Sequence, residues 1–378
     1  MHVLILGARA PACLEWARAF AAAGWRVTVA DSLAFPLARS SRAAHAYLRL
    51  PEPRRDPAAW IGALVEHVRA HAVDVVVPTC EEVFYLAHGL ARLAPHCRVI
   101  TSDFALLHQL HHKGTFAAMT AGWPVGAPET RLVGTRAELD ALPAREWVLK
   151  PAYSRFASRT LIRPGAAALA AVAPTPAHPW VAQEYVGGRE HCSFSVLLDG
   201  RLRAHACYHP RYRIGRGSGI YFEATDPSPV RAMLEHFGRV TGYTGQVGFD
   251  FIERADGAFR VLECNPRATS GVHLFDDQPA ALVEALSPGD GVLTPTAGTR
   301  MIALAMVLFA APLQGWRRAF WRDFARGRDV IVRDGDRGPL VAQVPGLLEI
   351  VGRMITRRCG LLAASTADIE WDGQPLGA

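Results

Sequence analysis

The first 105 residues alternate short apolar segments with segments of helical periodicity, and this alternation limits the possible folds more than any other feature of the sequence. It predicts strands over 2–7, 25–30, 73–77 and 98–101 and helices over 11–23, 60–71 and 84–93. Strands that alternate with helices build a parallel sheet covered by those helices. We therefore expect an α/β domain over roughly residues 1–105.

Two segments of this domain lie where a parallel sheet binds ligands, at the carboxyl ends of its strands. The first turn, over residues 7–12, lacks the Gly-x-Gly-x-x-Gly pattern, which argues against a dinucleotide site there. The second segment, Thr79-Cys-Glu-Glu82, is either a ligand-binding edge or the capped start of a helix. The first domain thus offers one open position for a ligand.

Beyond residue 105 the pattern changes to longer runs of strands. A helix from residue 104 carries Lys113, a further helix covers 232–241, and strands are expected over 147–150, 180–185, 193–198 and 202–208. Residues 209–229, rich in Arg and Gly, predict a long loop. Strands over 246–253 and 258–264 form a hairpin, and the last 78 residues or so have no clear pattern.

Lysine is almost absent from this chain, because only Lys113 and Lys150 among its 41 basic residues are lysines. Lysine is a compact point charge on a flexible stem, whereas arginine is a planar fork. Contact with a nucleotide phosphate is one role that can require the compact charge. The two lysines are therefore either phosphate ligands or chance survivors of a compositional preference for arginine.

The hairpin of residues 246–264 carries the strongest local signal. If its Asp-Gly dipeptide forms a two-residue turn, counting outward places Asp250 opposite Glu263, with Asn265 on the same face as Glu263. Two carboxylates that face each other repel, so a cation is expected between them. Two carboxylates and an amide oxygen suit Mg²⁺ that is completed by phosphate oxygens and water. The alternative, a solvated edge hairpin, does not explain the apolar residues packed around the acids.

With these motifs in this order, the sequence resembles the ATP-grasp superfamily over roughly residues 1–300. The Asp-x₁₂-Glu-x-Asn magnesium signature of that family is met by Asp250, Glu263 and Asn265, and its two phosphate-binding lysines fall on Lys113 and Lys150. The resemblance implies a mixed fold class, α/β and α+β, in which a Rossmann-like pre-ATP-grasp domain precedes a two-lobed ATP-grasp fold and a C-terminal extension. The implied limits are 1–105 for the first domain, 106–182 for the small lobe, 183–300 for the large lobe with the magnesium site, and 301–378 for the extension.

The resemblance also implies how adenosine is bound. The hinge strand would begin at residue 181, with Gln183 or Glu184 facing the adenine amino group. The backbone of Tyr185 and Val186 would read the edge of the ring, and Glu190 would bind the ribose hydroxyls.

Two arginine-rich segments are further candidates for contacts with ligands. The loop over 152–159 lacks the glycines of many relatives, but Ser154 and Arg155 in it could still reach phosphate, as could Arg159. These arginines are otherwise surface charges. The loop predicted at 209–229 lies where the family closes over substrate, and we expect a carboxylate to be recognised there by side chains drawn from Arg211, Arg213, Arg216 and Tyr221.

The reaction implied by the resemblance is ligation through an acyl phosphate. ATP, with Mg²⁺ or Mn²⁺, would phosphorylate a small-molecule carboxylate and release ADP, and a nucleophile such as an amine would then displace phosphate. The expected catalytic residues are Lys150, which neutralises phosphate charge, and Arg267, which stabilises the acyl phosphate. Such ligases serve amino-acid, peptide or secondary-metabolite biosynthesis. The alternatives are a bicarbonate-activating carboxylase or carbamoyl-phosphate-type enzyme, and a non-catalytic nucleotide-binding protein.

Composition indicates the setting and the partners. Seven scattered cysteines without a Cys-x-x-Cys pair and the absence of a signal-peptide pattern predict a cytoplasmic protein. A net charge of +6 gives no indication of a nucleic-acid partner. Residues 316–328 mix aromatic residues with five arginines, and they predict either a helix docked on the catalytic domain or a surface for an acidic carrier protein or an anionic membrane. ATP-grasp relatives often form dimers, so the resemblance allows a homodimer, and the sequence leaves the oligomeric state open.

Overall fold

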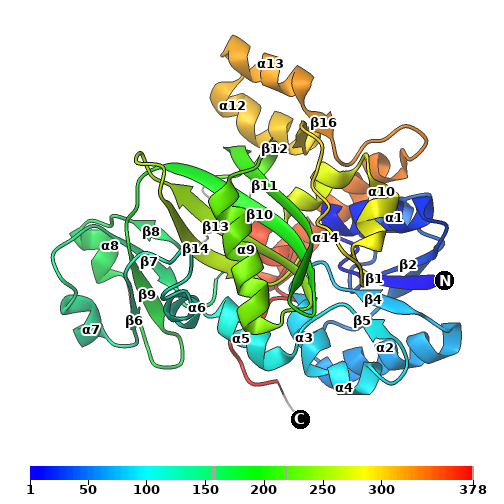
Figure 1. Ribbon diagram of the computed structural model, residues 1–378, viewed down its shortest axis with the longest axis horizontal. Coiled ribbons are helices and arrows are strands. Elements are labelled where there is room, and N and C mark those ends of the chain that lie inside the picture. The colour runs from blue at the N-terminus through cyan, green and yellow to red at the C-terminus, as the bar shows by residue number, and fades with distance from the viewer. Residues whose placement is uncertain (155–158, 216, 218, 377–378) are drawn as a thin grey trace.

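The structure, a computed structural model, describes residues 1–154, 159–215, 217 and 219–376. Its described strands form three sheets of five, four and seven strands. Figure 1 shows the four-stranded sheet at one end of the molecule, the five-stranded sheet at the other and the seven-stranded sheet between them. The fold class is mixed α/β, as the sequence predicts.

The five-stranded sheet is parallel, with strand order β3-β2-β1-β4-β5. Its strands are β1 (His2–Leu6), β2 (Arg26–Asp31), β3 (Ala46–Arg49), β4 (Val75–Val77) and β5 (Arg98–Val99). The helices between them are α1 (Pro11–Ala22), the 3₁₀ helix η1 (Leu37–Ser40), α2 (Pro57–His71), α3 (Glu82–His88) and α4 (Leu90–Leu93). Ile5 pairs with Val29 on one side and Val77 on the other, and all three are buried. The predicted parallel sheet is confirmed, and the short edge strand β3 is an addition that the apolar pattern does not reveal.

The four-stranded sheet has the order β6-β9-β7-β8 and is antiparallel. It consists of β6 (Thr130–Val133), β7 (Trp147–Pro151), β8 (Leu161–Ile162) and β9 (Trp180–Glu184), with α7 (Arg136–Asp140) and α8 (Ala166–Ala170) beside them. The helix expected from residue 104 is in fact two helices, α5 (Phe104–His111) and α6 (Lys113–Met119). His112 ends the first and caps the second, because its side chain accepts a hydrogen bond from the backbone N–H of Thr115. Lys113 is therefore the first residue of α6.

The seven-stranded sheet has the order β14-β13-β10-β11-β12-β15-β16. Its strands are β10 (Arg189–Leu198), β11 (Arg201–Arg213), β12 (Gly219–Thr225), β13 (Gly245–Glu253), β14 (Phe259–Asn265), β15 (Thr299–Met301) and β16 (Arg328–Asp329). The helix α9 (Ser228–Thr241) packs on this sheet and buries Val230, Leu234 and Phe237. The expectation of a loop over 209–229 is wrong, since β11 continues to Arg213 and β12 begins at Gly219.

The β13–β14 hairpin differs from the predicted geometry at two places whose effects cancel. Arg254 and Ala258 pair across a three-residue turn that has Gly257 in the left-handed conformation, so the expected two-residue turn is wrong. A bulge between Asp250 and Phe251 then restores the count, because Phe251 pairs with Val261 and Asp250 pairs with Glu263. The predicted pairing of the two acids is therefore confirmed.

The residues after β14 return across the molecule. They form the 3₁₀ helix η2 (Ser270–Phe275), α10 (Pro279–Glu284), α11 (Ala303–Ala305), the π-helical turn η3 (Met306–Ala310), α12 (Ala311–Gln314), α13 (Arg318–Arg326), α14 (Gly338–Arg357) and α15 (Leu361–Ala364). The last described segment packs against the first domain, where Trp371 contacts Phe84 and Phe104. Within the described residues, no helix is both long enough and apolar enough to cross a membrane.

Candidate active site

The centre of the candidate site is a pair of acidic side chains on adjacent strands. Asp250 of β13 lies directly opposite Glu263 of β14. The Nδ2 atom of Asn265 donates a hydrogen bond to Asp250 Oδ2 at 3.3 Å. The three residues of the predicted magnesium signature therefore share one face of the hairpin. Over the described residues, no group of three or more His, Cys, Asp and Glu side chains is suited to hold a metal.

Both lysines of the chain reach this pair of acids from different elements. Lys113 Nζ, at the start of α6, lies 3.6 Å from Glu263 Oε2, and Lys150 Nζ, on β7, lies 3.7 Å from the same oxygen. Lys113 also donates to the Ser154 carbonyl at 3.0 Å, and both lysine side chains are buried. Two cations and two carboxylates are thus held together where the four- and seven-stranded sheets meet.

The bulge in β14 provides a further partner for Lys150. At the bulge the Leu262 carbonyl accepts a hydrogen bond from Lys150 Nζ at 3.3 Å and another from Gln183 Nε2 at 3.4 Å. Gln183 Oε1 also accepts from Lys150 Nζ, at 3.2 Å. Bulges often occur beside active sites because they redirect backbone and side-chain groups. Here the bulge joins the two sheets through one buried ammonium group.

Asp250, Glu263, Lys113 and Lys150 lie close enough for their charges to shift the pKa values of one another. Burial, and next to it the charge of Glu263, raise the pKa of Asp250. Burial would also raise the pKa of Glu263, but the charges of Lys113 and Lys150 outweigh it and lower that pKa. Burial and the neighbouring Lys113 lower the pKa of Lys150, against the pull of Glu263. As the pH falls, Asp250 therefore binds a proton before Glu263 does.

A cleft of about 310 Å³ opens beside these groups, between the four- and seven-stranded sheets. The residues predicted to bind adenosine and phosphate that line it are Gln183, Glu184, Tyr185, Val186, Glu190, Lys150 and Ser154. Gln183 is buried and its amide donates to Thr130 Oγ1 at 3.1 Å, so its orientation is fixed. Glu190 forms an ion pair with Arg213 at the mouth, and the Arg163 guanidinium lies 4.6 Å from the centre of the Tyr185 ring.

The arginines predicted to contact phosphate or substrate lie in different surroundings. Arg213 lines the cleft, whereas Arg159 stacks over Trp180 at 5.3 Å. Arg155 and Arg216 lie outside the described residues. Arg211 instead pairs with Glu223 and Asp323 at 3.0 and 3.1 Å.

Tyr221, the fourth residue expected to bind substrate, is fully buried. Its hydroxyl donates to the Asp323 carbonyl at 2.8 Å. The structure therefore does not bring Tyr221 or Arg211 into the cleft, and both hold the C-terminal segment that contains Asp323.

Arg267 connects the acid pair to a second cavity of about 320 Å³. Its guanidinium donates to Asn265 Oδ1 at 3.0 Å and lies 3.8 Å from Glu81 Oε1. For the Thr79–Glu82 segment, the sequence leaves open a ligand-binding edge or the capped start of a helix. The helix α3 does begin here, at Glu82, but its N-cap residue Glu81 makes no side-chain capping hydrogen bond. The Glu82 carboxylate accepts from the backbone N–H groups of Thr79 and Cys80, and Glu81 reaches Arg267.

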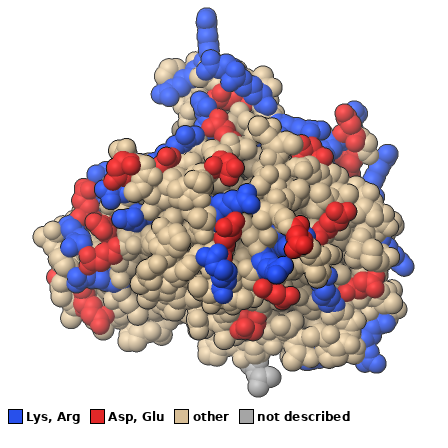
Figure 2. Space-filling model, viewed as in Figure 1, with Lys and Arg blue, Asp and Glu red and all other residues tan. Residues whose placement is uncertain are grey.

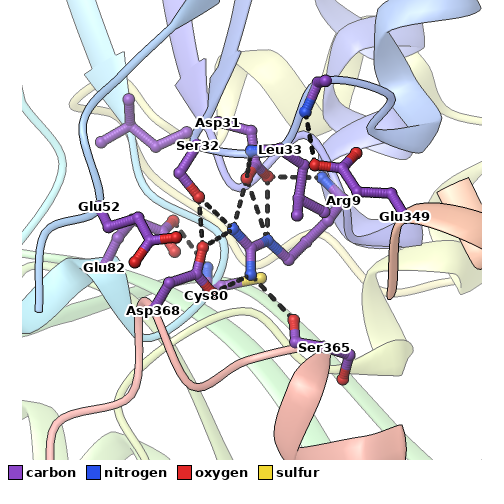
Figure 3. Close-up of polar contacts among 12 residues, drawn as sticks. Arg9, Asp31, Ser32, Leu33, Glu52, Cys80, Glu82, Glu349, Ser365 and Asp368 are labelled. Atoms are coloured by element: carbon purple, nitrogen blue, oxygen red, sulfur yellow. Dashed lines mark hydrogen bonds and ion pairs between the residues drawn. The ribbon is translucent and has the colours of Figure 1, made fainter. Parts of the chain in front are cut away.

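The wall of the second cavity contains a contact between the two ends of the chain that the sequence did not reveal. Arg9 lies between Asp31 and Asp368 (Figure 3), with its guanidinium 2.5 Å from one carboxylate and 2.6 Å from the other. Its Nη1 atom also donates to the Ser365 carbonyl at 2.8 Å. Because 359 positions separate Arg9 from Asp368, no local pattern marks this pair.

No protein-family model matches the sequence, and no curated protein matches it. Solved structures do resemble it. The N5-carboxyaminoimidazole synthetase of Staphylococcus aureus, solved with ADP, has a TM-score of 0.64 at 13% sequence identity over 82% of this chain and 85% of that chain. The L-amino acid ligase of Bacillus licheniformis has a TM-score of 0.61 at 15% identity over 76% of this chain and 75% of that one.

A third similar structure is the biotin carboxylase domain dimer of the Hydrogenobacter thermophilus 2-oxoglutarate carboxylase, solved with MgADP, ADP and bicarbonate. Its TM-score is 0.58 at 13% identity, over 79% of this chain and 73% of that chain. These likenesses confirm, at the level of the fold, the resemblance that the motifs predicted. The chain has the ATP-grasp fold.

Proposed function

We propose that the protein is an ATP-dependent ligase that activates a carboxylate as an acyl phosphate and joins it to a nucleophile such as an amine. The observation that carries this proposal is the approach of Lys113 and Lys150 to the single carboxylate of Glu263, at 3.6 and 3.7 Å. Two buried ammonium groups beside an acid pair suit the charge of a nucleotide polyphosphate. A non-catalytic nucleotide-binding protein would not require this concentration of charge.

Asp250, Glu263 and Asn265 would hold Mg²⁺ or Mn²⁺. The fit rests on the donor set, which is entirely oxygen, and on the raised pKa of Asp250, which a neighbouring cation would lower. When bound, the metal would neutralise charge on the phosphates of ATP. The similar carboxylase domain from Hydrogenobacter thermophilus was solved with MgADP, which supports the same assignment here.

ATP would occupy the cleft between the sheets, with its adenine against the strand that carries Gln183 and Glu184. The side chain of Gln183 is already engaged by Lys150, Thr130 and Leu262, whereas Glu184 is exposed and lines the cleft. We therefore assign recognition of the adenine amino group to Glu184, and recognition of the ring edge to the backbone of Tyr185 and Val186. Glu190 at the mouth would accept hydrogen bonds from the ribose hydroxyls.

The reaction would proceed in two displacements. A carboxylate oxygen of the acid attacks the γ-phosphorus, the bond to the β,γ-bridging oxygen breaks, and ADP leaves with the electron pair. The nucleophile then attacks the acyl carbon, and inorganic phosphate departs as the carbon–nitrogen bond forms and the amine loses a proton. Lys113 and Lys150 would hold the phosphates in position. Arg267, next to Asn265 and on the wall of the second cavity, would stabilise the negative charge of the acyl phosphate.

The experiment is an assay of nucleotide products with pooled amino acids and simple carboxylic acids in the presence of ATP and Mg²⁺. We expect ADP and phosphate whose release depends on the pool and is abolished in Glu263→Ala. The matched control is Glu235→Ala, on the exposed face of α9, which should leave turnover unchanged. AMP and pyrophosphate would contradict the proposed chemistry. Dependence on bicarbonate alone would favour the carboxylase alternative, and tight ATP binding without turnover would favour a binding protein.

A further inference from the structure

A helical arm projects from the seven-stranded sheet beside β15 and β16, at the opposite edge from the strands β13 and β14 of the proposed ligase site. We define the arm as residues 303–326, which comprise α11, η3, α12 and α13. Figure 1 shows α12 and α13 standing away from the rest of the molecule. The inner side of the arm packs against the sheet, where Phe320 is buried and the Tyr212 hydroxyl donates a hydrogen bond to Asp323 Oδ2 at 2.8 Å. The arm is therefore held in place by β11 and β12, and its outer side is available.

The outer side of the arm is unusually apolar. No charged residue occurs from Met301 to Trp316. Large apolar side chains on the arm that are between 37% and 77% exposed are Leu304, Val307, Leu308, Phe309, Leu313, Trp316 and Trp321. Seven large apolar side chains exposed within 18 residues of one projecting arm are more typical of an interaction site than of ordinary solvent-exposed surface.

Arginines accompany the apolar residues in the second half of the arm. Arg317, Arg318, Arg322 and Arg326 are exposed, and Figure 2 shows basic side chains gathered at the projecting tip. Among the residues that the structure describes, none of these four arginines forms an ion pair. The single acid between residues 301 and 328 is Asp323, which is buried and engaged by Tyr212 and Arg211. The exposed surface of the arm therefore carries positive charge without acidic compensation.

Three kinds of partner could cover such a surface, and the charge distinguishes between them. A second copy of the chain, packed arm to arm about a two-fold axis, would bring together two surfaces that both carry positive charge and expose no acid, which is unfavourable. An acidic protein would satisfy the arginines but would not require the uncharged run that ends at Trp316. The surface of an anionic membrane satisfies both parts, because phosphate groups bind arginine and the acyl boundary accepts Leu, Phe and Trp side chains.

We propose that the arm binds the surface of an anionic membrane. Leu308, Leu313 and Trp316 would enter the boundary between headgroups and acyl chains, and the arginines of α13 would contact lipid phosphates. The indole N–H groups of Trp316 and Trp321 already donate to the carbonyls of Leu313 and Gly315, so their rings can enter this boundary without unpaired donors. The projection of the arm lets it reach a planar surface while the body of the protein stays in water.

The test is flotation of the full chain with phosphatidylcholine vesicles that do or do not contain phosphatidylglycerol. We expect binding only to the anionic vesicles, and we expect it to weaken as salt rises from about 0.1 to about 1 M, because the Debye length falls from about 10 to about 3 Å. The triple variant Arg318→Glu, Arg322→Glu, Arg326→Glu should lower partitioning by at least about a hundredfold. The matched control replaces three exposed arginines outside the arm by glutamate, at Arg69, Arg92 and Arg239. This control variant should bind the vesicles like the unaltered protein.

A second variant set tests the apolar part independently of charge. Leu308→Ser, Leu313→Ser and Trp316→Ser together should also abolish flotation, while the unfolding midpoint stays close to that of the unaltered protein because these side chains are exposed. Failure of the unaltered chain to bind either vesicle would overturn the proposal, as would unchanged binding by both variant sets. If the unaltered chain does not bind vesicles but sediments as a dimer, and both variant sets sediment as monomers, the arm would instead be a dimer interface. ADP release measured in solution does not enter this test, so its outcome is independent of the ligase proposal.

Discussion

The Nζ atom of Lys150 lies 3.3 Å from the carbonyl oxygen of Leu262, and this contact joins the four-stranded sheet to the bulge in β14. The ammonium group also donates to Gln183 and lies near Glu263, so it is surrounded by three acceptors from two sheets. Its position is therefore fixed by both walls of the cleft before any nucleotide arrives. Such preorganisation is how a charged group stabilises phosphoryl transfer without reorganising during the reaction.

Lys150→Arg is expected to lower ATP turnover by at least about a hundredfold, although the charge is retained. The planar guanidinium is larger than the ammonium group and cannot occupy the buried space between Gln183, Leu262 and Glu263. ADP release with the substrate pool measures the effect, and Arg239→Lys on the surface of α9 is the control for the reverse exchange. Full activity of Lys150→Arg would show that this position does not depend on a compact charge.

The hairpin shows how a sequence prediction can reach the right pairing by an inexact route. The Asp-Gly signal correctly locates the turn, but the turn has three residues, and only the bulge at Leu262 restores Asp250 opposite Glu263. A bulge has no reliable signature in a single sequence, because it is selected by the contacts that it makes. Here those contacts are to Lys150 and Gln183, which are more than 70 residues away in the sequence.

The residues missed by sequence reasoning depend on long-range contacts. The segment 209–229 contains Gly and Arg in a density typical of loops, yet β11 and β12 form there because Tyr212 and Tyr221 pack against the arm. The pairing of Arg9 with Asp368 likewise has no local pattern. Apolar periodicity predicts elements whose partners are near in the sequence, and in this chain the first sheet and the hairpin meet that condition.

Two helical glycines predict opposite responses to alanine. A Cβ atom added to Gly238, within α9, would lie 2.1 Å from the Gly200 carbonyl oxygen, whereas one added to Gly352, within α14, would meet no atom within 4 Å. Alanine favours a helix by about 1 kcal/mol relative to glycine. Gly352→Ala should therefore stabilise the protein by about 0.5–1 kcal/mol, while overpacking should make Gly238→Ala destabilising by about 1–3 kcal/mol. Urea unfolding of the two variants measures both values. Stabilisation by Gly238→Ala would show that the backbone at Gly200 can shift to make room for the added methyl group.

We expect the folded protein to lose stability in mild acid because of the buried side chain of His205. Burial, assisted by the charge of Arg231, lowers the pKa of this histidine from 6.5 to about 4, and its Nδ1 atom is bonded to Ser195 at 2.9 Å. The unfolded chain therefore binds the proton first, so the contribution of His205 to stability is complete above pH 6.5 and is lost as the pH falls toward 4. The loss should amount to about 3 kcal/mol.

The free energy of unfolding, measured from pH 7 to pH 4, isolates this contribution by comparison between variants. His205→Gln should depend less steeply on pH than the unaltered protein, because glutamine does not titrate. His178→Gln, at an exposed loop position, should leave the slope unchanged. If the free energy of unfolding of His205→Gln depended on pH as steeply as that of the unaltered protein, His205 would have to be hydrated and protonated in the folded chain.

Asp368 predicts how strongly the last part of the chain is held to the first domain. Burial alone would raise the pKa of this carboxyl group, but the hydrogen bonds and charge of Arg9 outweigh it and lower the pKa well below its ordinary value. The carboxylate therefore stabilises the folded chain at pH values above about 4, and this stabilisation is lost as the pH falls below that value. Asp368→Asn should cost about 3 kcal/mol at pH 7, because it leaves the buried Arg9 with one carboxylate instead of two.

The cost of Asp368→Asn should become smaller as the pH falls below about 4, since the unfolded chain then binds a proton at Asp368 that the folded chain does not bind, which lowers the stability of the unaltered protein. Asp372→Asn is the matched control, because Asp372 pairs with Arg54 at the surface and should change stability by less than about 0.5 kcal/mol. Unfolding by urea at several pH values compares the two substitutions. Equal changes in the free energy of unfolding for Asp368→Asn and Asp372→Asn would show that the buried ion pair of Asp368 contributes no more to stability than a surface ion pair. A large effect at position 368 alone would show that the ion pairs of Asp368 with Arg9 and Arg353 hold the segment that lines the second cavity, beside the position from which Arg267 would act on the acyl phosphate.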